Sequence, residues 1–182
     1  MIVADFRIMK INRVFFTIIM LWYANCSFAQ SFHDMLLENV KGSVKSITYK
    51  RSEGSEYVTF AKDGKIGKKD IFSPVYNKDG YLIKCKSLLL GHIGETTFIY
   101  KNNNVEISRT EIGGGLFTIH YIYNTDGTVY QEVQSLEKGN IKQTAIYTFK
   151  YHKFDSHGNW NTRTVYCGEN SFFDHRVMTY WK

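Results

Sequence analysis

A short motif that recurs four times constrains the fold of this chain more than any other feature. It consists of an aromatic residue, two variable residues, Asp or His, Gly, one further residue and an apolar residue. Its ungapped copies span 60–66, 76–82, 123–129 and 154–160, and a degenerate copy lies at 100–105. A glycine between an aromatic and an apolar residue at this spacing is typical of a tight hairpin turn.

Each position of the motif has a physical role in such a turn. The glycine supplies the positive φ that a tight hairpin requires, and the Asp or His before it tolerates turn geometry. The aromatic residue ends one strand and the apolar residue begins the next, so the two form a cross-strand pair. The predicted turn residues are Asp63 and Gly64, Asp79 and Gly80, Asp126 and Gly127, and His157 and Gly158.

The segments between the motifs have the period of β-strands. In 116–123, Phe117, Ile119, Tyr121 and Tyr123 share one face, and polar residues interrupt the other. Aromatic residues make up 16% of the chain, and the single proline removes few backbone donors from paired strands. We therefore predict an all-β fold, an antiparallel meander of roughly ten strands built from hairpin repeats. A short helix over 31–39 is the most helix that the sequence predicts.

The repeats resemble the tyrosine-aspartate units of RHS/YD-repeat proteins, which carry a Tyr-Asp-x-x-Gly core before an apolar residue. The nearest copies are 76–82 and 123–129, with Asn in place of the first Asp, whereas 154–160 keeps that Asp and replaces the Tyr. The resemblance covers most of 39–181 and implies a small secreted protein with a few degenerate units. Because four or five units are too few to build the shell of large RHS proteins, we expect neither encapsulation nor a toxin segment.

The first residues have the pattern of a signal peptide. Three basic residues precede an apolar run over 14–23, and Ser27 and Ala29 provide the small residues of a cleavage site. The run is too short to span a bilayer, which takes about 20 residues. We predict a signal peptide over 1–29, a single domain over 30–182, and a secreted or periplasmic location at the cell envelope. The alternatives are an uncleaved membrane anchor and lipid attachment at Cys26.

The charge of the chain argues against nucleic acid as a partner. Removing three basic residues and one acidic residue with the leader lowers the formal net charge from +6 to +4. The densest basic stretch, 62–69, holds four lysines and is interpreted as a solvated turn region. We expect no nucleic-acid partner, and no membrane span after the leader is removed.

Two cysteines remain in the mature chain, Cys85 and Cys167. In an oxidising compartment they could close a disulfide across a long loop, which would contribute about 4 kcal/mol. The alternative is a pair of buried thiols that act as small hydrophobic residues. The sequence leaves both open.

No motif predicts catalysis, a cofactor or a metal site. His152, Asp155 and His157 lie close in sequence, and Asp174 and His175 could approach them, but these residue types are also common in turns. There is no G-x-S-x-G elbow, and the glycine run 113–115 lies between strands, whereas a phosphate loop opens into a helix. Paired carboxylates for glycoside hydrolysis are available among five strand glutamates, Glu95, Glu106, Glu111, Glu132 and Glu137.

Binding is the function class that the sequence favours. One face of the meander packs on its own core, which leaves Tyr and Trp on another face to stack on sugars or contact a protein. We predict a non-enzymatic envelope protein with a structural or binding role and a glycan or protein ligand. The alternatives are a small hydrolase that uses Glu or Asp, and a subunit that pairs through an edge strand. The candidate ligand-face aromatics are Tyr121, Tyr123, Tyr147, Tyr151, Trp160 and Tyr166.

Overall fold

The computed structural model describes residues 32–51, 54–67, 71–89 and 91–182. The chain divides into two units, Met1–Gln30 and Ser31–Lys182, and the account below concerns the second. The predicted signal peptide and Cys26 lie outside the described residues.

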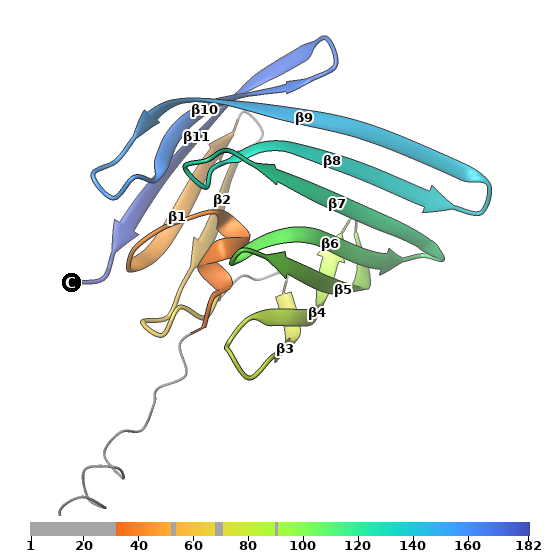
Figure 1. The fold of residues 1–182 in the computed structure, drawn as a ribbon, viewed down its shortest axis with the longest axis horizontal. Helices are drawn as coiled ribbons and strands as arrows, with labels where there is room; N and C mark the ends of the chain where they lie inside the picture. Colours follow the sequence, from red (N-terminus) through yellow and green to blue (C-terminus); the bar gives the residue numbers. More distant parts are fainter. Residues whose placement is uncertain (1–31, 52–53, 68–70, 90) are drawn as a thin grey trace, which may run out of the picture. The chain divides into compact units, whose positions relative to one another are not determined.

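The described residues form one antiparallel sheet and a single 3₁₀ turn, η1 (Asp34–Glu38) (Figure 1). This confirms the predicted all-β meander, with eleven strands where roughly ten were expected. The strands are β1 (Val44–Arg51), β2 (Gly54–Thr59), β3 (Ile71–Tyr76), β4 (Leu82–Leu89), β5 (His92–Lys101), β6 (Asn104–Ile112), β7 (Gly115–Tyr123), β8 (Val129–Lys138), β9 (Ile141–Phe154), β10 (Trp160–Cys167) and β11 (Asn170–Tyr180).

The strand order is β2-β1-β11-β10-β9-β8-β7-β6-β5-β4-β3. From β3 to β11 each strand pairs with its neighbour in sequence, whereas β1 pairs with the last strand, from Val44 opposite Tyr180 to Lys50 opposite His175. The two edges of the sheet, β2 and β3, are consecutive in the chain. An isolated bridge from Phe60 to Ile66 closes the connection between them into a hairpin.

The N-terminal segment is shorter and tighter than the predicted helix. Only the five residues of η1 are helical, and His33 at their N-terminus makes no side-chain cap. The turn ends at Asn39, whose backbone is left-handed (φ 49°, ψ 56°). Before it, the backbone N–H groups of Phe32 and His33 donate to Asp63 O at 2.7 Å and Gly80 O at 3.1 Å. We call residues 32–43 the strap.

The four motif copies form turns with the same backbone hydrogen bonds. In each, the glycine N–H donates to the carbonyl three residues earlier, as in Gly127 to Asn124 at 3.0 Å. Each glycine has a positive φ, from 75° at Gly158 to 89° at Gly64. We call these the repeat turns, residues 61–65, 77–81, 124–128 and 155–159.

The aromatic and apolar residues of each copy lie directly opposite each other in the sheet, as the motif predicts. The pairs are Phe60 and Ile66, Tyr76 and Leu82, Tyr123 and Val129, and Phe154 and Trp160, with Tyr100 and Val105 in the degenerate copy. The strand register shifts next to the pair in β5, β7 and β10. The repeat therefore combines a turn with a local irregularity of the strand pairing.

Tyrosine hydroxyl groups link the units from the copy at 76–82 onward. Tyr100 Oη donates to the Leu82 carbonyl at 2.9 Å, and Tyr123 Oη donates to the Val105 carbonyl at 2.8 Å. Tyr151 Oη donates to the Val129 carbonyl at 2.6 Å in the same way. In every case the acceptor is the apolar residue that closes the previous motif copy. We call these three bonds the tyrosine ladder.

The strap crosses the repeat turns in chain order and binds all four. Its start bonds to the first two turns, as given above, and Asn39 Nδ2 donates to Gly127 O at 2.8 Å. Lys41 exchanges two bonds with the Asn159 side chain, at 2.6 and 2.9 Å. Asp34, which is fully buried, accepts bonds from Ile66 N and Tyr76 Oη at 2.9 and 2.7 Å. The strap thus fixes the repeat turns at one end of the sheet.

The sheet curls strongly around the strap. Glu56 of β2 and Phe98 of β5 line one cavity although seven strands separate them in the sheet order. Only a curled sheet brings such distant strands to one space, and Figure 1 shows η1 beside its concave face. The largest core cluster joins β1, β2 and the strap to Trp160, and a second, smaller cluster centres on Phe149.

The two described cysteines are not joined by a disulfide. Cys85, on β4, and Cys167, at the end of β10, are both free thiols, which corrects the disulfide alternative. Five strands lie between β4 and β10 in the sheet order. Neighbouring strands are about 4.8 Å apart, whereas the Cα atoms of a disulfide lie within about 7 Å.

Candidate functional site

A cavity of about 190 Å³ lies between the strap and the inner face of the sheet. Its lining combines aromatic and charged side chains from strands far apart in the sheet. Those that carry the argument are Tyr49, Glu56, Tyr121, Glu132, Trp160 and Arg163. We call this space the concave cavity.

A fully buried arginine supports the floor of the cavity. The Arg176 guanidinium donates to the carbonyls of Trp160 at 2.7 Å, Glu38 at 2.9 Å and Asn39 at 3.3 Å. It also lies over the Trp160 ring, with its Cζ 3.8 Å from the ring centroid. Because these carbonyls belong to the strap and to the first residue of β10, Arg176 fastens the strap to β10 and β11.

A second arginine lines the cavity in a fixed orientation. Arg163 Nε and Nη2 both donate to Asp174 Oδ2, at 3.0 and 2.8 Å. The guanidinium Cζ lies 4.1 Å from the Phe149 ring centroid and 4.2 Å from that of Trp160. Asp174 is buried, so this ion pair is screened less by solvent than a surface pair and holds its geometry.

Glu132 brings a carboxylate to the same cavity. It lies opposite Tyr121 on β7 and Tyr147 on β9, and it accepts a hydrogen bond from Gln134 Nε2 at 3.0 Å. Burial raises the pKa of Glu132 above its ordinary value, and the Gln134 bond and the Arg163 charge oppose that shift only in part. A half-buried carboxyl beside a fixed guanidinium offers both an acceptor and a donor to a ligand.

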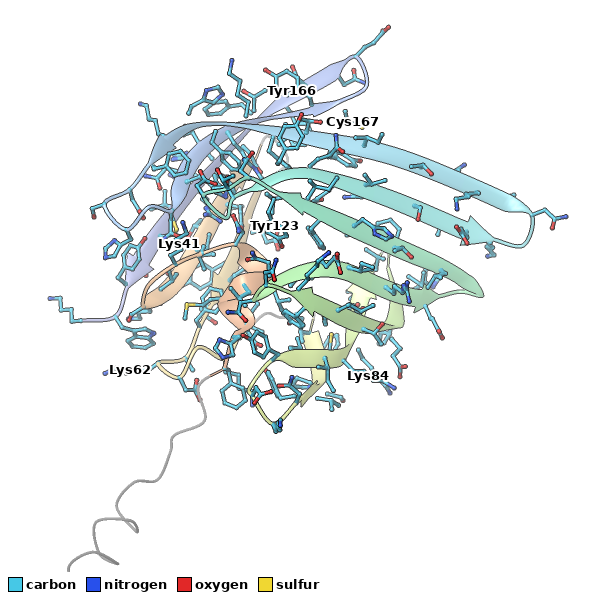
Figure 2. All side chains as sticks on the ribbon, viewed as in Figure 1. Lys41, Lys62, Lys84, Tyr123, Tyr166 and Cys167 are labelled. Atoms are coloured by element: carbon cyan, nitrogen blue, oxygen red, sulfur yellow. The ribbon has the colours of Figure 1, made fainter. Side chains whose placement is uncertain are left out.

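The structure places the six candidate aromatics in different surroundings. Tyr121 and Tyr123 line the concave cavity, and Figure 2 labels Tyr123 beside the strap. Tyr147 and Tyr151 pack against the cluster around Phe149. Tyr166 is exposed on β10 beside the buried Val165, so its side chain points to the opposite, convex face.

Trp160 borders the cavity as part of the core. Its side chain is only 2% exposed, and two arginines lie over the ring. A sugar has no access to the ring face that stacking requires.

The histidines and acids considered for a metal site make other contacts. His152 Nε2 is 2.8 Å from Thr164 Oγ1, Asp174 binds Arg163, and Asp155 accepts a hydrogen bond from Tyr180. The Tyr180 bond and two backbone N–H groups lower the pKa of Asp155, although burial alone would raise it. Within the described part of the chain, no group of three or more His, Cys, Asp or Glu residues could hold a metal ion.

The sequence predicted neither Glu38 and Glu56 of the cavity lining nor the two arginines, Arg163 and Arg176. Both arginines occupy inward positions, on β10 and β11. The sequence signal that could have predicted the contact of Arg163 with Asp174 is the two-residue turn after Cys167. In the structure Cys167 pairs with Asn170 across this turn, and the same register places Arg163 opposite Asp174.

Neither the protein-family models nor the curated proteins yield a match to this chain. The resemblance to YD-repeat proteins therefore stays a prediction from the motif. Within the described ranges, no helix has the length and apolar character needed to cross a membrane.

Proposed function

We propose that this protein is an exported binding protein of the cell envelope that holds a glycan in the concave cavity. The observation that carries the proposal is that Glu132 and the fixed Arg163 line one cavity together with Tyr121. Sugar hydroxyl groups donate and accept hydrogen bonds, so they match a site that presents a carboxylate beside a guanidinium and a phenol.

The rigidity of the site supports binding. Arg163 is held by Asp174 and by two rings, and the strap that closes one side is held by Arg176 and the repeat turns. A site whose side chains are already in place loses little conformational entropy when a ligand enters.

A second candidate function is glycan hydrolysis, and the pKa of Glu132 favours it. A carboxyl whose pKa is raised by burial stays protonated closer to neutral pH, as a general acid requires. Glu56 and Glu38 line the same cavity and supply further carboxyl groups. In this reaction Glu132 would protonate the glycosidic oxygen while a second carboxylate assists the attack of water.

Titration of the protein with envelope oligosaccharides by calorimetry tests the binding proposal. Glu132→Gln removes the charge and keeps the shape, and Glu137→Gln on the same strand is the matched control because Glu137 is exposed and pairs with Lys142. We expect Glu132→Gln to weaken binding at least 10-fold, since a hydrogen bond to a charged group contributes about 1.5–3 kcal/mol. Equal affinities for wild type and Glu132→Gln would refute the site.

The same mixtures, followed by mass spectrometry, distinguish binding from hydrolysis. Oligosaccharides that are bound and recovered intact support the binding protein. Cleavage products that disappear with Glu132→Gln and persist with Glu137→Gln would replace it with the hydrolase.

A further inference from the structure

A second chamber adjoins the concave cavity on the inner face of the sheet. It measures about 260 Å³ and is lined by residues of β3 to β7 and the strap. Leu37, Glu38 and Phe98 line both spaces, so the two meet beside η1. We call the second space the apolar chamber.

Three hydroxyl-bearing residues of the apolar chamber form hydrogen bonds with one another. Ser87 Oγ lies 2.6 Å from Thr96 Oγ1, which lies 2.9 Å from Thr110 Oγ1. These side chains occupy neighbouring positions across β4, β5 and β6. These two bonds use two of the three hydroxyl donors, so at most one of these donors is left for a ligand.

The rest of the apolar chamber is hydrophobic. Its lining includes Ile71, Leu89, Phe117 and Ile119, and among the described residues around it only Glu38, at the junction with the concave cavity, carries a charge. Burial raises the pKa of the Cys85 thiol to about 11, which keeps this lining group neutral at physiological pH. Such a surface gains free energy when an apolar group displaces water from it.

The two spaces together present a polar end and an apolar end to one ligand. Building on the proposed function, we propose that the concave face binds a glycolipid-like amphiphile, with a neutral polyhydroxyl head in the concave cavity and an alkyl chain in the apolar chamber. An anionic head is disfavoured because Glu132 would repel it and Asp174 already neutralises Arg163. The strap residues Leu37 and Glu38 would lie where the head joins the chain.

The chain length of the ligand provides the test. Each methylene group that enters an apolar site tightens binding about fourfold, until the site is full. We would titrate the full chain with hexyl, heptyl, octyl and nonyl β-glucosides, each below the concentration at which it forms micelles. The expected result is a fourfold rise in affinity per added carbon.

Two variants on β7 locate the alkyl chain. Ile119→Ser makes the apolar chamber more polar, and Ile122→Ser is the matched control, because Ile122 is exposed and points to the opposite face. We expect Ile119→Ser to reduce the gain per carbon to less than twofold and Ile122→Ser to leave it unchanged. The wild-type series keeps the proposal testable if Ile119→Ser does not fold.

The outcomes separate this inference from the proposed function. Glucoside binding that depends on Glu132 but not on chain length would overturn the alkyl site and leave glycan binding in place. Affinity that rises with chain length but is unaffected by Ile119→Ser would place the alkyl chain elsewhere and also overturn the inference. Failure of every glucoside to bind, while free oligosaccharides still bind, would overturn it as well.

Discussion

The tyrosine ladder predicts a stability contribution that can be measured one hydroxyl group at a time. Tyr100→Phe, Tyr123→Phe and Tyr151→Phe each keep the ring and remove one hydrogen bond to a backbone carbonyl. A half-buried carbonyl that loses its donor costs about 1–2 kcal/mol. With a urea m-value of about 2 kcal/mol/M, each variant lowers the unfolding midpoint by about 0.5–1 M.

Combining the three changes sharpens the test. The tyrosines lie on β5, β7 and β9, so consecutive members of the ladder are two strands, or about 10 Å, apart and their effects add. The triple variant should lose about 3–6 kcal/mol, a large part of the 5–15 kcal/mol that stabilises a typical domain. Tyr166→Phe, at an exposed position, is the control and should change stability by less than about 0.5 kcal/mol. Ladder variants as stable as this control would refute the reasoning.

Three further results are expected. Gly127→Ala should lower the free energy of unfolding by about 1 kcal/mol, because Gly127 has a positive φ. Gly64→Ala should lower it by about 1–3 kcal/mol more, because the added Cβ would lie 2.2 Å from a backbone oxygen of the strap. Urea unfolding measures both, and equal losses would contradict the close approach. Since folding raises the pKa of Glu132 from its ordinary 4.5, the native state binds the proton more tightly, so this contribution to stability is lost as pH rises from 4.5 through the folded pKa. Glu132→Gln should remove that slope from unfolding curves measured at several pH values, and an unchanged slope would assign it to other groups. In a thiol-reagent assay on a Cys26→Ser background, Cys167 should react well before Cys85, which is buried with its pKa raised to about 11, and the reverse order would contradict their placement.

The repeat turns and their cross-strand pairs were predictable because their determinants are local. Gly80 needs a positive φ, and Tyr76 and Leu82 are close enough in sequence for the turn to bring them together. The strap was not predictable in the same way. Phe32 and His33 donate to turns 31 and 47 residues away, and no local pattern of the sequence reveals such distant partners.

The candidate site was predictable only in part. Alternation predicted that Tyr121 shares a face with Phe117 and Ile119, but not that this is the inner face, which also carries the core. Trp160 was taken for a ligand-face residue because the sequence does not show that Arg176, from β11, covers its ring. Whether Cys85 and Cys167 could form a disulfide depended on the order of the strands in the sheet, which no local pattern around either cysteine reveals.

The pairing of β1 with β11 has a consequence for the order in which the molecule can form. The ribosome makes β1 long before β11, so β1 finds this partner only when β11 has been synthesised, since Val44 lies opposite Tyr180. Until then β1 and β10 each present an unpaired edge, and the strap lacks Arg176. The pairs between β1 and β11 therefore join residues far apart in sequence, and their formation is a late, slow event in folding. Loss of β11 would add two open edges, β1 and β10, to the existing edges β2 and β3, which is a route to aggregation rather than to a smaller stable sheet.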